Sequence, residues 1–95
     1  MCNICSRFID HDEDHYEDYC IDCYMLLETA KRALAVARRV GVRRYGPSTW
    51  KDVSLREHVE HAQAHLINFR AGSIDEDHLA HAICRLVMTE ANRCN

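Results

Sequence analysis

The sequence predicts a mainly α-helical protein in which a small N-terminal lobe leads into a domain of three helices. Four cysteines stand in two C-x2-C pairs near the N-terminus. Beyond them, apolar residues recur at the three- and four-residue spacing of amphipathic helices, and we see no strand pattern outside the lobe. We assign the lobe to residues 1–23 and the helical domain to residues 24–95. A chain of 95 residues builds only a modest core, so we expect oligomerisation to complete it.

The cysteine pairs predict a structural zinc knuckle. Each pair can present two thiolates to one ion, and two pairs complete the tetrahedral sulfur shell that zinc favours. Four thiolates leave no position for water, so the ion would serve folding and not catalysis. Two disulfides are the main alternative, but they need an oxidising compartment, and no apolar signal segment follows Met1. Weaker candidate ligands, His11 and His15, lie in the acidic segment between the pairs. The expected ligands are Cys2, Cys5, Cys20 and Cys23.

The first helix is expected over residues 23–40, where apolar positions cover a wide arc of the helical wheel. An arc of this width suggests that the helix packs against more than one neighbour. Gly41 is expected to cap its end, and residues 42–52 are expected to form a loop that carries the single tryptophan. The rings of this loop either plug the open end of a helix bundle or contact a ligand.

The other two helices are expected to form an antiparallel hairpin. Ser54 can cap the first of them, with Glu57 completing a capping box, and this helix should end near Arg70. The next helix should begin near Asp75 after a short link, which favours antiparallel packing. The apolar stripes expected to form the core are Leu55, Val59, Ala62, Leu66 and Phe69 on the first helix and Leu79, Ala82, Ile83, Leu86 and Val87 on the second.

Histidines lie along one flank of these stripes on both helices of the hairpin. In an antiparallel hairpin the two sets stand at matching heights from the turn, so we expect them to converge near Arg85. A side chain that flanks a core opens no large cavity when truncated, so alanine at His65 or His78 should weaken binding with little effect on stability. His58 lies outside the matched heights and should matter least for binding. The converging residues are His61, His65, His78 and His81.

Three interpretations of these histidines remain open. They bind a catalytic metal ion, with Glu57, Glu60 or Asp77 as carboxylate ligands or base. Alternatively, they hydrogen-bond a phosphate or a base edge directly, together with Arg85 and the arginines of the loop. In the third interpretation they are polar boundary residues that hydrogen-bond to one another across the hairpin.

Charge and hydropathy restrict the partners. The formal net charge of −3 argues against binding to duplex nucleic acid, which requires a basic surface. No apolar run approaches the length of a membrane-spanning helix, so we expect no membrane partner. Outside the quartet, Cys84 and Cys94 are expected to be reduced thiols of a cytoplasmic protein.

A family resemblance covers about residues 28–89. The segment Arg-Tyr-Gly-Pro-Ser-Thr-Trp-Lys at residues 44–51, then Ala-His-Leu at 64–66 and His-Leu-Ala-His-Ala at 78–82, resembles the N-terminal domain of phage-type dATP/dGTP diphosphohydrolases. That family is similar in style to the MazG-like all-α nucleotide pyrophosphohydrolases. The resemblance implies a helical, oligomeric domain that handles purine deoxynucleotides in the cytoplasm of a phage-infected cell.

The resemblance also implies functional residues. MazG-like enzymes hold Mg²⁺ with E-x-x-E on one helix and E-x-x-D on the next. Glu57 and Glu60 supply the first motif, and with Asp77 they would hold Mg²⁺ and activate water if the protein hydrolyses its ligand. The second motif is missing, which favours an alternative function as a non-catalytic binder that sequesters a nucleotide signal of host defence. The expected nucleotide-binding residues are Arg44, Tyr45, Trp50, His61, His65, His78, His81 and Arg85, with Arg43 as a further candidate.

A function of a different class also remains open. The chain could be a zinc-stabilised interaction module whose acidic lobe contacts a host protein. In that case the histidines would be structural.

Overall fold

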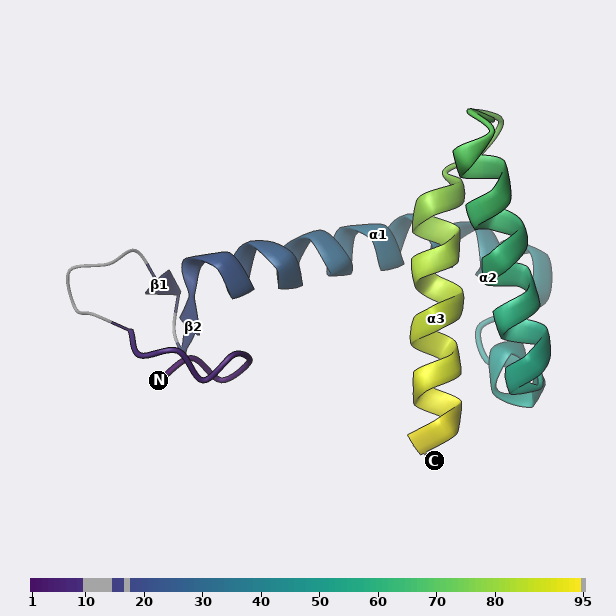
Figure 1. Ribbon diagram of the computed structural model, residues 1–95. Coiled ribbons are helices and arrows are strands. Elements are labelled where there is room, and N and C mark those ends of the chain that lie inside the picture. The colour runs from purple at the N-terminus through teal and green to yellow at the C-terminus, as the bar shows by residue number, and fades with distance from the viewer. Residues whose placement is uncertain (10–14, 17, 95) are drawn as a thin grey trace. The chain divides into compact units, whose positions relative to one another are not determined.

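The computed structural model describes residues 1–9, 15–16 and 18–94 (Figure 1). It is mainly helical, and a cysteine cluster precedes the helices, so the predicted fold class is confirmed. The chain forms two compact units, Met1–Lys31 and Arg32–Asn95, and the boundary between them falls inside α1. The predicted division after residue 23 and the expected oligomer stay predictions. The elements are β1 (His15–Tyr16), β2 (Tyr19–Cys20), α1 (Ile21–Tyr45), the 3-10 helix η1 (Thr49–Asp52), α2 (Leu55–Arg70) and α3 (His78–Cys94).

The first unit is a small knuckle built around the cysteines. The backbone N–H of Cys2 donates to the carbonyl of Arg7 at 2.8 Å, and the N–H of Ser6 returns to the carbonyl of Cys2 at 3.0 Å. Strands β1 and β2 pair in antiparallel register, with His15 opposite Cys20. The buried centre is made of cysteines packed against two partly buried apolar residues, namely Cys2, Cys20, Cys23, Ile9 and Tyr19.

Helix α1 is longer than the sequence predicted, and the expected cap at Gly41 is wrong. The helix runs through Gly41 and ends at Tyr45. The residue that ends it is Gly46, whose φ of 88° lies in the left-handed region and whose N–H donates to the carbonyl of Val42 at 2.9 Å. A glycine with positive φ at this position is a common helix ending because it carries no Cβ. The predicted loop of residues 42–52 is therefore replaced by residues 46–54, which include η1 and which we call the link.

Helices α2 and α3 form the predicted antiparallel hairpin (Figure 1). The Ser54 hydroxyl accepts a hydrogen bond from the N–H of Glu57 at 3.1 Å, which confirms the expected N-cap. Helix α2 ends in a Schellman arrangement at Gly72, where φ is 81°. Helix α3 begins at His78 and not at the predicted Asp75, because the Asp77 carboxylate accepts from the N–H of Ala80 at 3.0 Å and thereby caps the helix.

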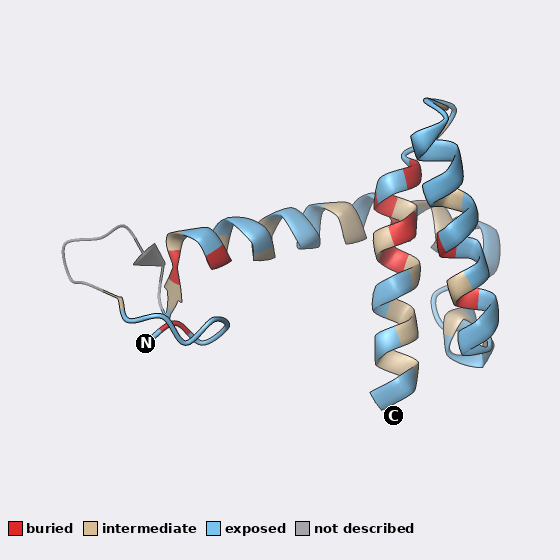
Figure 2. Cartoon of the chain, in the orientation of Figure 1, coloured by how far each residue is buried: buried red, intermediate tan, exposed pale blue. Residues whose placement is uncertain are grey.

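The buried face of the hairpin differs from the predicted apolar stripes (Figure 2). Small residues and two histidines are buried there in place of the large apolar side chains. Of the predicted stripes, only Ala62 and Ala82 are buried. Val59 and Ile83 are half-buried. The six other members remain 37–49% exposed and leave apolar surface on the hairpin: Leu55, Leu66, Phe69, Leu79, Leu86 and Val87. The buried positions are His58 and Ala62 on α2 and His78, Ala80, Ala82 and Cys84 on α3.

Among the described residues, no helix combines the length and the apolar character needed to cross a bilayer.

Candidate functional sites in the knuckle and in the helical unit

The four cysteines of the first unit are brought together as a possible metal site. Their sulfur atoms all lie within 4.8 Å of one another. The Sγ atoms of Cys5 and Cys20 are 3.8 Å apart, and a tetrahedron with zinc–sulfur bonds of about 2.3 Å has edges of about 3.8 Å. Cys20 immediately precedes α1 and Cys23 lies in its first turn, as predicted. The donor set therefore fits a divalent ion of the zinc type.

The protonation of the sulfurs is uneven across this cluster. Hydrogen bonds from the backbone of Cys5, supported by those of Cys20, lower the pKa of Cys2 to about 6. Burial, together with the neighbouring thiols, raises the pKa of Cys23 to about 12. Four sulfurs at this spacing cannot all be ionised without a cation between them, so metal binding would displace protons. The candidate ligand His11 and the side chain of His15 lie outside the described residues, as does most of the acidic segment expected to contact a host protein.

A cavity of about 350 Å³ opens in the second unit. It is lined by the C-terminal part of α1, by the link, and by one face of each hairpin helix. Three arginines reach its wall, Arg38, Arg44 and Arg85, whereas Glu57 is the single carboxylate among its described lining residues. The cavity therefore gathers positive charge in a chain whose formal net charge is −3. Its aromatic lining residues are Tyr45 and Trp50, and its histidines are His61, His65 and His81.

The link, which carries Trp50, is fastened from both sides. The Trp50 carbonyl accepts from His58 Nε2 at 2.9 Å and from Asn92 Nδ2 at 3.1 Å. Arg38 donates through Nη2 to the carbonyl of Pro47 at 2.7 Å. These bonds come from α1, α2 and α3, so each helix of the unit holds the cavity wall in place.

His58 has a structural role that its sequence position did not reveal. Its side chain is fully buried, with 0% exposure. Because Nε2 must donate to the Trp50 carbonyl, Nδ1 is free to accept from Arg85 Nη1 at 3.1 Å. His58 therefore contacts an arginine that lines the cavity. The expectation that His58 matters least for binding stays a prediction, and this contact argues against it.

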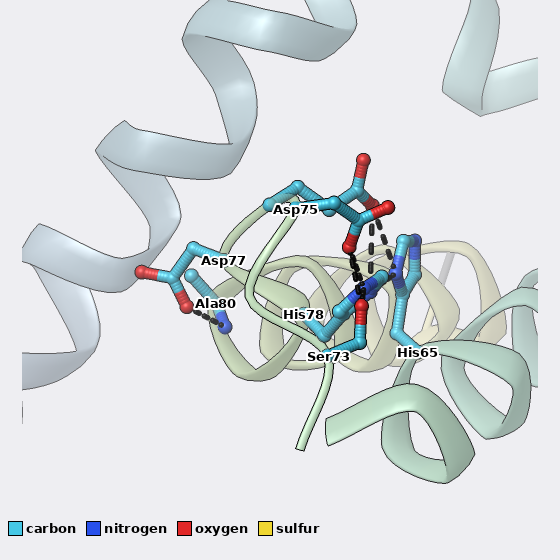
Figure 3. A network of polar contacts seen from close by, with 7 residues as sticks. His65, Ser73, Asp75, Asp77, His78 and Ala80 are labelled. Atoms are coloured by element: carbon cyan, nitrogen blue, oxygen red, sulfur yellow. Dashed lines mark hydrogen bonds and ion pairs between the residues drawn. The ribbon is translucent and has the colours of Figure 1, made fainter. Parts of the chain in front are cut away.

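A second polar network lies at the turn of the hairpin (Figure 3). His65 and His78 face each other through their Nδ1 atoms at 2.9 Å. On its other side, His78 Nε2 donates to the Asp75 carboxylate at 2.7 Å, and the Ser73 hydroxyl donates to the same carboxylate at 2.6 Å. The Glu76 carboxylate lies 3.2 Å from His65 Nδ1. The ligating atoms of His65, Glu76 and His81 all lie within 4.8 Å of one another, so this cluster could also hold a metal ion.

Two pKa shifts describe the charge state of this network. Burial lowers the pKa of His65 and outweighs the opposing effect of the Glu76 carboxylate. Hydrogen bonds from Ser73 and His78 lower the pKa of Asp75. Around neutral pH the network therefore combines an uncharged imidazole at His65 with an ionised carboxylate at Asp75.

The structure brings most of the predicted site residues together. Glu57 and seven of the eight expected nucleotide-binding residues line the cavity: Arg44, Tyr45, Trp50, His61, His65, His81 and Arg85. Three expected residues do not line it. Glu60 pairs with Arg56 at 3.0 Å, Asp77 caps α3, and His78 is buried in the turn network. Because His78 is only 5% exposed, the premise that it merely flanks the core is wrong, and we now expect its truncation to cost stability. Arg43 is not among the lining residues either.

Two residues of these sites were missed from the sequence. Arg38 was not among the expected binding residues, and nothing in its spacing indicates that it reaches the cavity. Glu76 was not among the expected site residues either, but because Asp77 caps α3, Glu76 lies in the turn beside the histidines. The run Asp-Glu-Asp before a histidine could have indicated it, since acidic residues often precede a helix as well as begin it.

The comparisons with known proteins support the resemblance seen in the sequence. Residues 10–95 match the family described as dATP/dGTP diphosphohydrolase, N-terminal. The chain belongs to this family. The match is wider than the expected 28–89: it takes in the second cysteine pair and leaves Cys2 and Cys5 outside. No curated protein and no solved structure matches the chain significantly.

Proposed function

We propose that the second unit binds purine deoxynucleotides in the cavity described above. The observation that carries this proposal is the charge of the cavity wall, in which Arg38, Arg44 and Arg85 face a single described carboxylate, Glu57. Guanidinium groups bind phosphate oxygens through paired hydrogen bonds, so three of them suit a polyphosphate. A positively lined recess in an acidic chain also attracts anionic ligands from solution.

The aromatic lining residues of the cavity support the proposal that a nucleobase binds beside the phosphates. Tyr45 and Trp50 are both lining residues, and their rings could stack on a purine. The volume of about 350 Å³ lies within the range of small-molecule sites. The purine preference itself rests on the family, whose description names dATP and dGTP. By the same resemblance we place this function in the cytoplasm of a phage-infected cell.

The first test compares two neighbouring arginines by calorimetry with dATP, dGTP, dCTP and a cyclic purine nucleotide. Arg44 lines the cavity and Arg43 does not, although both are exposed in the last turn of α1. Arg44→Gln should weaken dATP or dGTP binding about tenfold, which corresponds to about 1.4 kcal/mol. Arg43→Gln should bind as the unchanged protein does. Equal losses in both variants, or no binding of any nucleotide, would remove the proposal.

A second candidate function, release of pyrophosphate from the bound nucleotide, is favoured by the family description. Glu57 is placed to take part, because it lines the cavity. Glu60 pairs with Arg56, and Asp77 caps the N-terminus of α3. Of the three expected Mg²⁺ ligands, only Glu57 therefore lines the cavity and supports a catalytic role. Incubation with dATP, dGTP and Mg²⁺ at protein concentrations near that of the nucleotide, followed by pyrophosphate detection, tests this version.

The outcome of that incubation distinguishes a hydrolytic enzyme from a protein that only binds the nucleotide. Pyrophosphate release that is lost in Glu57→Gln supports hydrolysis. Tight binding with the nucleotide recovered intact supports the non-catalytic alternative, in which the protein sequesters a nucleotide.

For the first unit we propose a structural zinc ion held by the cysteine quartet. The spacing of the four sulfurs supports this ion. When bound, the ion would connect the first cysteine pair to the second and so stabilise the knuckle, which has little apolar core of its own.

A further inference from the structure

Three ligand-type atoms meet at the turn of the hairpin (Figure 3). His65 Nδ1 and His78 Nδ1 are 2.9 Å apart. Glu76 Oε1 lies 3.2 Å from the first and 3.5 Å from the second. The three atoms therefore form a nearly equilateral triangle contributed by α2, the turn and the first residue of α3.

The size of this triangle suits one metal ion. A circle through the three atoms has a radius of about 1.9 Å, calculated from the three separations. Metal bonds to imidazole nitrogen and carboxylate oxygen measure about 2.0–2.2 Å. An ion placed about 1 Å from the plane of the triangle would thus reach all three atoms with little movement of the chain.

The hydrogen bonds of His78 prepare its Nδ1 for this role. Its Nε2 lies 2.7 Å from the Asp75 carboxylate and must carry the proton of that hydrogen bond. Its Nδ1 then carries a lone pair that faces His65 and Glu76. A histidine that donates one ring N–H to a carboxylate while the other nitrogen faces a cluster of donors has the arrangement seen around bound metals. Asp75 is in turn held by the Ser73 hydroxyl at 2.6 Å.

We propose that His65, Glu76 and His78 bind a divalent transition-metal ion, with His81 beside them. A ring nitrogen of His81 lies within 4.8 Å of the ligating atoms of His65 and Glu76. Imidazole and carboxylate donors together suit zinc, cobalt, iron or manganese, whereas Mg²⁺ requires oxygen ligands. The site is separate from the cysteine quartet, and its binding of metal does not depend on the proposed nucleotide function.

The position of the site suggests what the ion could contact. His65 and His81 also line the cavity, whereas His78 does not. An ion bound here would have the buried His78 on one side and the cavity on the other. Its remaining coordination position would then be open to water or to an anionic group of a cavity ligand.

The test uses the full chain without nucleotide. Metal-free protein is loaded with one equivalent of zinc and then titrated with Co²⁺, and the cobalt environment is read by X-ray absorption at the cobalt edge. We expect two ions per chain and a cobalt shell that shows imidazole scattering. A chain that takes up only one ion, or a cobalt shell without imidazole, would overturn the proposal.

A pair of matched carboxylate variants assigns the ligand. Glu76→Gln keeps the shape of the side chain and should weaken cobalt binding at least tenfold. Glu60→Gln removes an equivalent charge from the exposed face of α2 and should leave cobalt binding unchanged. Asp75→Asn should also weaken binding at least tenfold, because partners of metal-bound histidines contribute this much to affinity. Trp50 fluorescence during heating checks that each variant remains folded, and cobalt affinity in folded Glu76→Gln equal to that of the unchanged protein refutes the assignment.

Discussion

Replacement of His58 by alanine should destabilise the second unit strongly. His58 is 0% exposed and is the largest fully buried side chain of the hairpin. Its imidazole connects the Trp50 carbonyl, at 2.9 Å, with Arg85 Nη1, at 3.1 Å. Alanine removes the ring, leaves a void between α2 and α3, and takes away both hydrogen bonds.

The magnitude follows from these losses. Truncating a large buried side chain to alanine costs about 2–5 kcal/mol, depending on how far the site collapses. The hydrogen bonds add about 1 kcal/mol each, but the Trp50 carbonyl keeps its bond from Asn92 at 3.1 Å, and Arg85 can turn toward the cavity. We therefore expect a total near 3 kcal/mol. For a unit of this size that corresponds to a fall in melting temperature of roughly 12–24 °C.

Trp50 provides the assay, because it is the only tryptophan and lies in the second unit. Its fluorescence during heating or urea titration reports on that unit and not on the knuckle. His61→Ala is the matched control, since His61 lies on the same helix but is exposed. A loss below about 0.5 kcal/mol in His58→Ala, similar to that of His61→Ala, would show that the buried histidine does not hold the link against the hairpin.

Further outcomes are expected for the two units. Purified protein should contain one zinc in the knuckle, and Cys23→Ser should lose it and unfold the knuckle, because structural zinc contributes on the order of 10 kcal/mol to folding; metal analysis and near-UV circular dichroism check this. Ser54→Ala should cost about 1 kcal/mol in urea unfolding, since its hydroxyl caps α2, and a change below a few tenths would contradict the cap. His65→Ala should weaken nucleotide binding about tenfold by calorimetry, whereas His78→Ala should in addition lower the melting temperature, because His78 is buried. The lowered pKa of His65 means that the unfolded chain takes up its proton first, so stability should be full above about pH 6.5 and decline as the pH falls below it; the fall in melting temperature of the metal-free protein below about pH 6.5 should be smaller in His65→Gln.

The local features of this chain could be predicted because each depends on residues close in sequence. The C-x2-C spacing placed the sulfurs of Cys20 and Cys23 at the start of α1, and Ser54 caps α2 as expected. Where two local signals competed, the sequence was ambiguous. Both Gly41 and Gly46 could have ended α1, and only the backbone conformation shows that Gly46 does.

The packing face of the hairpin could not be predicted, because it depends on which neighbour each helix meets. Apolar periodicity pointed to Leu66 and Leu79, yet these remain exposed while His58 and His78 are buried. Burial of an imidazole is acceptable only when both ring nitrogens find partners, and those partners, such as Trp50 and Asp75, come from outside the helix concerned. Periodicity along one helix contains no information about them.

The fastening of the Trp50 carbonyl has a consequence for how this protein tolerates change. His58 and Asn92 hold the link that presents Trp50 to the cavity, yet neither His58 nor Asn92 lines the cavity. In a saturation mutagenesis library selected for ligand binding, both positions should therefore be depleted as strongly as residues of the wall. A search for specificity-altering substitutions should leave them fixed and vary Tyr45 and His61, which line the cavity and are exposed. Contact with the cavity therefore does not decide which positions tolerate substitution, because positions that hold the link are as constrained as those of the wall.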